Sequence, residues 1–128
     1  MSGVAASVRR MTLTVEMITF DALDAPTLAR WWAAQTGGVV QGAPDAPFIV
    51  VAPGPSGGPN LGFQQVAVPT RGKNRVHVDL TTADRAAEVA RLTGDGAKFV
   101  AEHREDGLAW TVLADPEGNQ FCVSGSHG

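Results

Sequence analysis

The sequence predicts an α+β fold made of two βαβββ modules with mixed, largely antiparallel sheets. One observation is the order of elements, because strand, helix and three strands follow one another twice between residues 12 and 124. Another is internal similarity, since a shift of 58 residues brings Asp21 onto Asp79 and Gly38 onto Gly96. One such unit cannot bury its own sheet, so two units are expected to pack together.

Length and composition indicate one domain. The chain has 128 residues, of which 44% are hydrophobic and 18% are charged, so it can bury a core. We assign the domain to residues 11–125, with module one over 12–68 and module two over 73–124. Residues 1–10 are expected to form an N-terminal tail.

Charge and hydropathy argue against several kinds of partner. The net charge is −3 and no basic cluster could contact phosphates, so we expect no nucleic-acid partner. No apolar run approaches the roughly 20 residues of a membrane span, so we expect no membrane partner. Cys122 is the only cysteine, which excludes an intrachain disulfide and agrees with a cytoplasmic location.

Module one is predicted to begin with a strand over 12–21, where apolar and polar residues alternate. A helix follows, with Asp24 as its N-cap and Pro26 in its first turn. The Gly37-Gly38 pair is expected to end this helix. The other predicted elements are strands over 39–41, 48–52 and 61–68, a proline- and glycine-rich loop over 53–59, and a linker over 69–73.

Module two repeats this order. We predict Thr82 as the N-cap of its helix and a tight turn over 115–119, where Asp, Pro and Gly follow one another. Turn formation is the expected role of that segment. The predicted elements are a helix over 83–93 and strands over 75–81, 97–103, 108–113 and 120–124.

The strand over 75–81 carries the strongest functional candidates. Its apolar residues point to one face, while Arg75, His77 and Asp79 point to the other. His77 is open to three interpretations: a hydrogen-bonded residue in a wet groove, a ligand contact or general base, or a metal ligand. An imidazole suits a base because it changes charge near neutral pH. Asp79 either pairs with Arg75 or orients the ring of His77 or a substrate amine.

Other candidates depend on which way their side chains point. Gln64 is a ligand-binding candidate if it faces a cavity, and a solvated residue if it does not. Phe48 and Trp110 are candidates to line an apolar pocket, with core packing as the alternative. Cys122 is predicted to be a small buried residue, with a reactive thiolate assisted by His77 as the alternative. Of the adjacent Trp31-Trp32 pair, one ring should be core and the other should lie at the helix edge, against a partner chain or the tail.

Three features together resemble the vicinal oxygen chelate superfamily, the group of glyoxalases, bleomycin-resistance proteins and extradiol dioxygenases. They are the doubled βαβββ order, the stretch NRVHVDL over 74–80 and the stretch DPEGNQF over 115–121. The sequence over 24–32 further resembles the glyoxalase-like branch. The resemblance implies sheets that curl around a cavity, and a homodimer with cavities at its junction.

Metal enzymes of the superfamily hold a divalent ion with His and Glu or Gln on the first and last strands of each module. Here His77 matches, Gln64 is a weak oxygen ligand, and Cys122 stands where Glu is usual. The first strand of module one offers only Met17 or Thr19. Because a catalytic divalent site generally needs three good protein ligands, we expect no metal cofactor.

We therefore expect a glyoxalase-like protein that binds a small organic molecule in a sheet-lined cavity without a complete metal centre. Its expected binding residues are Gln64, His77, Asp79, Trp110 and Phe48, with His77 as the base if acid–base chemistry occurs. The alternatives are a divalent-metal-dependent lyase, isomerase or dioxygenase, and an accessory or regulatory domain with a vestigial cavity. The sequence leaves open whether a reaction is catalysed.

Overall fold

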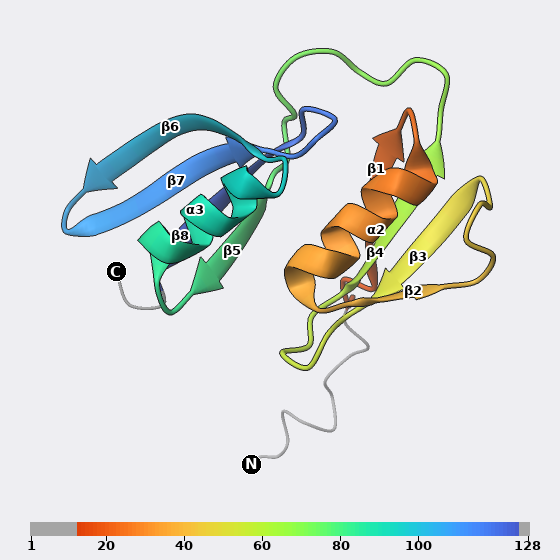
Figure 1. Cartoon of the computed structure of the whole chain (residues 1–128), viewed down its shortest axis with the longest axis horizontal. Coiled ribbons are helices and arrows are strands. Elements are labelled where there is room, and N and C mark those ends of the chain that lie inside the picture. Colours follow the sequence, from red (N-terminus) through yellow and green to blue (C-terminus); the bar gives the residue numbers. More distant parts are fainter. Residues whose placement is uncertain (1–12, 126–128) are drawn as a thin grey trace.

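The computed structural model describes residues 13–125, which fold into two βαβββ modules lying side by side (Figure 1). The first module comprises β1 (Met17–Ala22), α2 (Ala25–Thr36), β2 (Val39–Gln41), β3 (Phe48–Ala52) and β4 (Asn60–Gln65). The second comprises β5 (Val78–Thr82), α3 (Arg85–Gly94), β6 (Lys98–Glu105), β7 (Leu108–Ala114) and β8 (Gln120–Gly125). The predicted α+β class and order of elements are confirmed.

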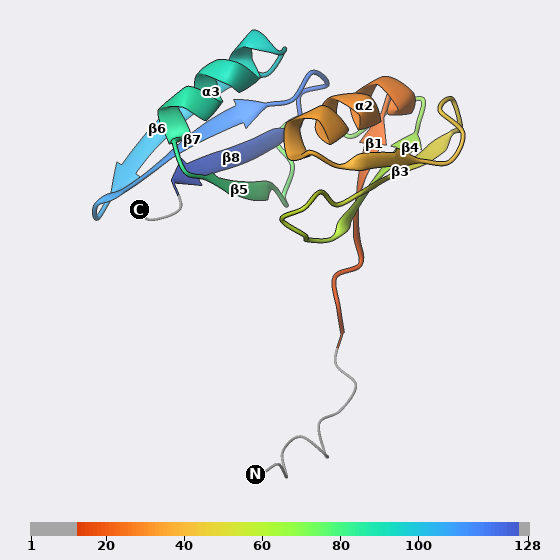
Figure 2. The same ribbon diagram turned by 60° about the horizontal axis from the view of Figure 1, so that its bottom comes forward.

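Each module is one four-stranded mixed sheet with a helix on one face. The strand orders are β1-β4-β3-β2 and β5-β8-β7-β6. The first and last strands of each module run parallel, and the other neighbours are antiparallel. Neither sheet closes into a barrel, and both helices lie on the same side of the molecule (Figure 2). Each sheet therefore keeps one face open.

The strand registers show that the internal similarity is a structural repeat. Asp21 lies opposite Gln64 in β1 and β4, and Asp79 lies opposite Cys122 in β5 and β8. Both pairs differ by the same 58 positions. Phe63 and Phe121, also equivalent under this shift, are both buried. The repeat thus preserves both the pairing and the face that each helix covers.

Helix α2 begins and ends as predicted. The Asp24 side chain accepts a hydrogen bond from the backbone N–H of Thr27, and a second from its hydroxyl at 2.8 Å. Gly37 ends the helix with φ 72°, a left-handed conformation that glycine adopts without a Cβ penalty. Leu28, Ala29 and Trp32 are its buried residues beyond the first turn.

The two modules are joined through α2 and the turn over 115–119. The indole of Trp32 is buried and donates to Asp115 Oδ2 at 2.9 Å. Asp115 is 1% exposed and also accepts from the backbone N–H groups of Glu117 and Asn119. The carboxylate of Glu117 accepts from two backbone N–H groups, of Leu23 and Asp24, just before α2. The predicted turn is present, and its hydrogen bonds to module one also hold the two modules together.

One tryptophan of the pair is core, as predicted, but the other packs within the chain. Trp31 is half-buried, its indole donates to the backbone carbonyl of Asp95, and its ring packs on Phe121 of module two. Trp31 therefore contributes to the contact between modules. This placement supplies no evidence for a partner chain at that position.

Several predicted boundaries were wrong. Asp84, not Thr82, caps α3, because Thr82 is still paired with Gly125 in the sheet. Strand β5 begins at Val78, where its pairing with Phe121 of β8 starts, so Arg75 and His77 of the predicted strand lie ahead of it.

The middle two strands of module one have the predicted bounds, but its first and last strands were predicted to extend too far. Strand β1 begins at Met17, and Leu13 and Val15 ahead of it are exposed. Residue 12 of the predicted strand lies outside the described residues. Strand β4 ends at Gln65, and Val68 is exposed. In both segments, the alternation of apolar and polar residues thus continues beyond the residues that pair with a neighbouring strand. No helix among residues 13–125 is long and apolar enough to cross a membrane.

Candidate functional site

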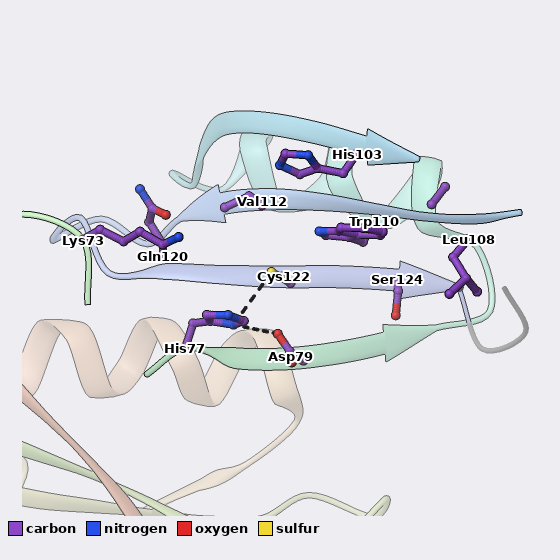
Figure 3. Close-up of a pocket in the computed structure, with 12 residues that line it drawn as sticks. Lys73, His77, Asp79, His103, Leu108, Trp110, Val112, Gln120, Cys122 and Ser124 are labelled. Atoms are coloured by element: carbon purple, nitrogen blue, oxygen red, sulfur yellow. Dashed lines mark hydrogen bonds and ion pairs between the residues drawn. The ribbon is translucent and has the colours of Figure 1, made fainter. Parts of the chain in front are cut away.

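The main candidate site is a hollow of about 530 Å³ on the open face of the second module's sheet (Figure 3). Strands β5, β8, β7 and β6 contribute side chains to it. Its walls are formed by Lys73, His77, Asp79, His103, Leu108, Ala109, Trp110, Val112, Gln120, Cys122, Ser124 and Gly125. The hollow thus contains three of the predicted site residues.

Strand pairing aligns these residues in rows across the sheet. Asp79 lies opposite Cys122, which lies opposite Val112. One step further along, Ser124 lies opposite Trp110, which lies opposite His103. Alternate residues of a strand share a face, so both rows face the hollow while the residues between them face α3.

The polar centre of the site is a pair formed by His77 and Asp79. His77 Nδ1 lies 2.8 Å from Asp79 Oδ1, and the two side chains are 41% and 69% exposed. Since a carboxylate only accepts, Nδ1 carries the hydrogen of this bond, and a neutral ring keeps its lone pair on Nε2. The partner of Asp79 is therefore His77; among the ion pairs of residues 13–125, none joins Asp79 to Arg75.

Cys122 lies beside this pair and is half-buried, not in the core as predicted. Its Sγ is 3.9 Å from His77 Nδ1. Burial raises the pKa of the Cys122 thiol, and the negative charge of Asp79, with a hydrogen bond to it, raises it further. The thiol therefore stays protonated near neutral pH and is not an activated nucleophile.

The donor set can be tested against a divalent metal ion. Ligand atoms of His77, Asp79 and Cys122 lie within 4.8 Å of one another, which meets the count of three. However, two ligands of a tetrahedral ion are about 3.3–3.6 Å apart, given metal–ligand bonds near 2.0–2.2 Å. The 2.8 Å between His77 and Asp79 is shorter than this tetrahedral spacing, but it matches the roughly 2.8–3.0 Å between neighbouring ligands of an octahedral ion with bonds near 2.0–2.1 Å. His77 and Asp79 are hydrogen-bonded to each other, so an ion would have to replace this bond, and the absence of a resident metal stays a prediction.

The opposite end of the hollow is aromatic. The rings of His103 and Trp110 are stacked, with centroids 5.3 Å apart and planes 25° from parallel. Trp110 was a sequence candidate, but His103 was missed. The strands that contain His103 and Trp110 were both predicted, but which residues lie opposite each other depends on the hairpin that joins the strands. The sequence also gave no signal for Lys73, Gln120 and Ser124 as wall residues.

Gln64 and Phe48 are not brought to this hollow. They lie opposite each other on β4 and β3, in the sheet of module one, and both are exposed. Neither lines the hollow that contains His77. The structure thus brings His77, Asp79 and Trp110 together and leaves the other two candidates on the open face of the first module, where their role stays a prediction.

A second hollow, of about 620 Å³, lies between the modules. Its polar side chains already bind one another: Arg91 donates to both carboxylate oxygens of Glu88 and to Gln35 Oε1. The loop over 53–59 forms another part of its wall. His77 and Asp79 also line this second hollow, so the pair lies where the two hollows meet.

Several solved structures share this fold at low sequence identity. A glyoxalase/bleomycin resistance protein/dioxygenase family enzyme from Burkholderia phytofirmans PsJN superposes with TM-score 0.73 and 16% identity, over 88% of this chain and 98% of that one. A superfamily member from Sphaerobacter thermophilus DSM 20745 has TM-score 0.71 and 20% identity, over 91% and 100%. A glyoxalase-related enzyme from Fulvimarina pelagi has TM-score 0.68 and 16% identity, over 90% and 89%. These likenesses establish the fold.

No curated protein matches the sequence significantly. A family model does match, under the description glyoxalase-like domain, and it covers residues 17–124. That range begins with β1 and reaches into β8, so it includes both modules and the hollow. The chain therefore belongs to the glyoxalase-like domain family.

Proposed function

We propose that this protein binds a small organic molecule in the hollow of its second module, with the His77–Asp79 pair as the polar anchor. The observation that supports this is the 2.8 Å contact between the two side chains on the wall of a 530 Å³ hollow. Ligand sites are typically concave and mostly apolar with a few polar groups, and this hollow has that character. The family relationship agrees with it but does not name a ligand.

The same pair supports metal-free acid–base chemistry. Asp79 holds the hydrogen on Nδ1 of His77, which leaves Nε2 to accept a proton from a bound compound. In this arrangement Asp79 orients the ring and stabilises the imidazolium that proton transfer would form. Binding alone requires only the hydrogen bond to Nε2, so sequestration and proton transfer are two uses of one geometry.

A homodimer is part of the proposal, because the open face of module one needs a partner to become part of a cavity. Phe48 is 43% exposed on that face, next to Gln64. A second copy could place these two residues over the hollow of the first. Sedimentation velocity measures the oligomeric state, and a monomer at all concentrations would contradict the dimer. A free thiol at Cys122 suits the cytoplasm, the location we propose.

The decisive experiment is ligand-observed NMR with a set of small aromatic and aliphatic alcohols, carboxylic acids and amines. We expect some of these compounds to bind the wild type and to lose binding in His77→Ala. Lys98→Ala is the matched control, because Lys98 is exposed on β6 outside the hollow. If His77→Ala changes only the melting temperature, the hollow is vestigial and the accessory-domain alternative holds.

The competing function is a metal-dependent lyase, isomerase or dioxygenase, favoured by the clustering of three donors within 4.8 Å. Elemental analysis of protein purified without a chelating column distinguishes the two. Stoichiometric nickel, zinc, iron or manganese, lost in His77→Ala, would overturn the metal-free proposal. Substoichiometric metal that is unchanged in that variant would support it.

A further inference from the structure

The two ends of the hollow differ in chemistry, although Ser124 lies beside Trp110 (Figure 3). Lys73, Gln120 and His77 lie at one end, with Asp79 next to His77. Trp110, His103 and Leu108 lie toward the other end. A compound that fits both ends must therefore have an apolar part and a polar part.

The aromatic end is built as a flat surface. His103 and Trp110 are direct cross-strand partners in β6 and β7, and their rings are close to parallel. Cross-strand aromatic pairs usually stabilise a sheet by burying each other. Here, however, the pair lies on the open face, His103 is exposed and neighbouring Leu108 is 54% exposed. The stack thus forms part of the wall of the hollow.

The distance between the ends limits the size of the compound. The row that contains Trp110 is one same-face step from the row that contains Asp79, and the two residues are two strands apart. With a strand rise of about 3.3 Å and a strand spacing of about 4.8 Å, their backbones are about 12 Å apart. The side chains occupy part of this distance, and a ligand of a few fused rings with one polar substituent spans the remaining part.

We propose that the ligand is a planar aromatic compound with a hydrogen-bond-donating group, whose ring stacks at Trp110 and His103 while the donor group bonds to His77. This inference rests on the proposed function and specifies its ligand class. A planar ring gains from the indole face through offset stacking as well as through buried area, whereas a puckered saturated ring gains through area alone. The donor group fits the lone pair on His77 Nε2 that the bond to Asp79 leaves free.

The test is isothermal titration calorimetry with two probes of similar size, naphthol and its saturated analogue decahydronaphthol. Wild-type protein should bind naphthol about two- to tenfold more tightly, the range expected from stacking beyond area. Trp110→Leu should remove this preference, because it should weaken the binding of naphthol more than that of decahydronaphthol, which loses contact area alone. Phe99→Leu is the control, because Phe99 is 59% exposed on β6 but does not line the hollow.

Each outcome separates the inference from the function on which it rests. If both probes bind equally, or the preference for naphthol survives in Trp110→Leu, the ligand class is wrong while the proposed function stands. If neither probe binds, the ligand class is wrong, and the NMR measurement with alcohols, carboxylic acids and amines then decides the proposed function. If Trp110→Leu folds poorly, His103→Leu provides a second test. Because His103 is exposed, its replacement should leave the melting temperature unchanged. It should reduce the preference for naphthol over decahydronaphthol at least twofold.

Discussion

Replacing Trp32 with Phe tests whether the contact between the modules contributes to stability as its geometry indicates. The indole Nε1 lies 2.9 Å from Asp115 Oδ2, and both residues are 1% exposed. A hydrogen bond to a carboxylate acceptor contributes about 1.5–3 kcal/mol, and its loss leaves a buried oxygen with one donor fewer. The smaller ring also leaves a cavity, so we expect Trp32→Phe to lower the free energy of unfolding by about 2–4 kcal/mol.

The neighbouring tryptophan supplies a matched control. Trp31 Nε1 donates to the neutral backbone carbonyl of Asp95 at a partly exposed position, and such a bond contributes about 0.5–1.5 kcal/mol. Trp31→Phe removes the same atoms as Trp32→Phe, so the difference between the variants reports the buried contact with Asp115 together with the cavity left at the buried site.

Urea denaturation measures both variants directly, and thermal melting gives a second estimate. For a domain of this size about 1 kcal/mol corresponds to roughly 4 °C, so Trp32→Phe should melt about 8–16 °C below the wild type. Equal losses of free energy in the two variants would refute the claim that the Trp32–Asp115 contact holds the modules together.

Three further outcomes follow from the contacts. Burial, and after it Asp79, raise the pKa of the Cys122 thiol, so iodoacetamide should alkylate the thiol more slowly than free cysteine at about pH 8. Alkylation should be faster in Asp79→Asn than in the wild type. An unchanged rate in that variant would show that Asp79 does not act on the thiol. The hydrogen bonds from Thr27 lower the pKa of Asp24 below 3.8. The stabilisation by this carboxylate is therefore present above pH 3.8 and is lost as the pH falls through its lowered pKa in the folded state. The difference in melting temperature between wild type and Asp24→Ala should decrease in acid. Glu117→Gln should destabilise the chain by about 0.5–1 kcal/mol in urea, because the amide keeps one acceptor oxygen for the two backbone donors, and a neutral effect would remove Glu117 from the contact between the modules.

Much of module architecture was predictable because it depends on short-range pattern. Asp24 and Gly37 were identified as helix ends because capping uses neighbouring backbone groups. His77 and Asp79 were expected on one face because alternation along a strand sets direction. The doubled order of elements and its shift of 58 residues were likewise visible, and the strand registers reproduce them.

The errors arose where the position of a residue depends on a neighbour that is far away in the sequence. Thr82 is a reasonable cap by its own chemistry, but Gly125 of β8 keeps it in the sheet. Cys122 is small and apolar enough for a core, but its place in the register turns it toward the hollow, beside His77. Local sequence contains no signal for either pairing, because each depends on strands 43 residues apart.

The sequence by itself determined the fold class, the repeat and the proximity of His77 to Asp79, because these follow from spacing along the chain. Tertiary structure alone decided that Trp110 and His103 stack at one end of the hollow, and that Gln64 and Phe48 lie on a separate sheet. It also assigned the turn over 115–119 to the contact between modules. The physical reason is that cross-strand register and the packing of one module on another are set by contacts between residues far apart in the chain.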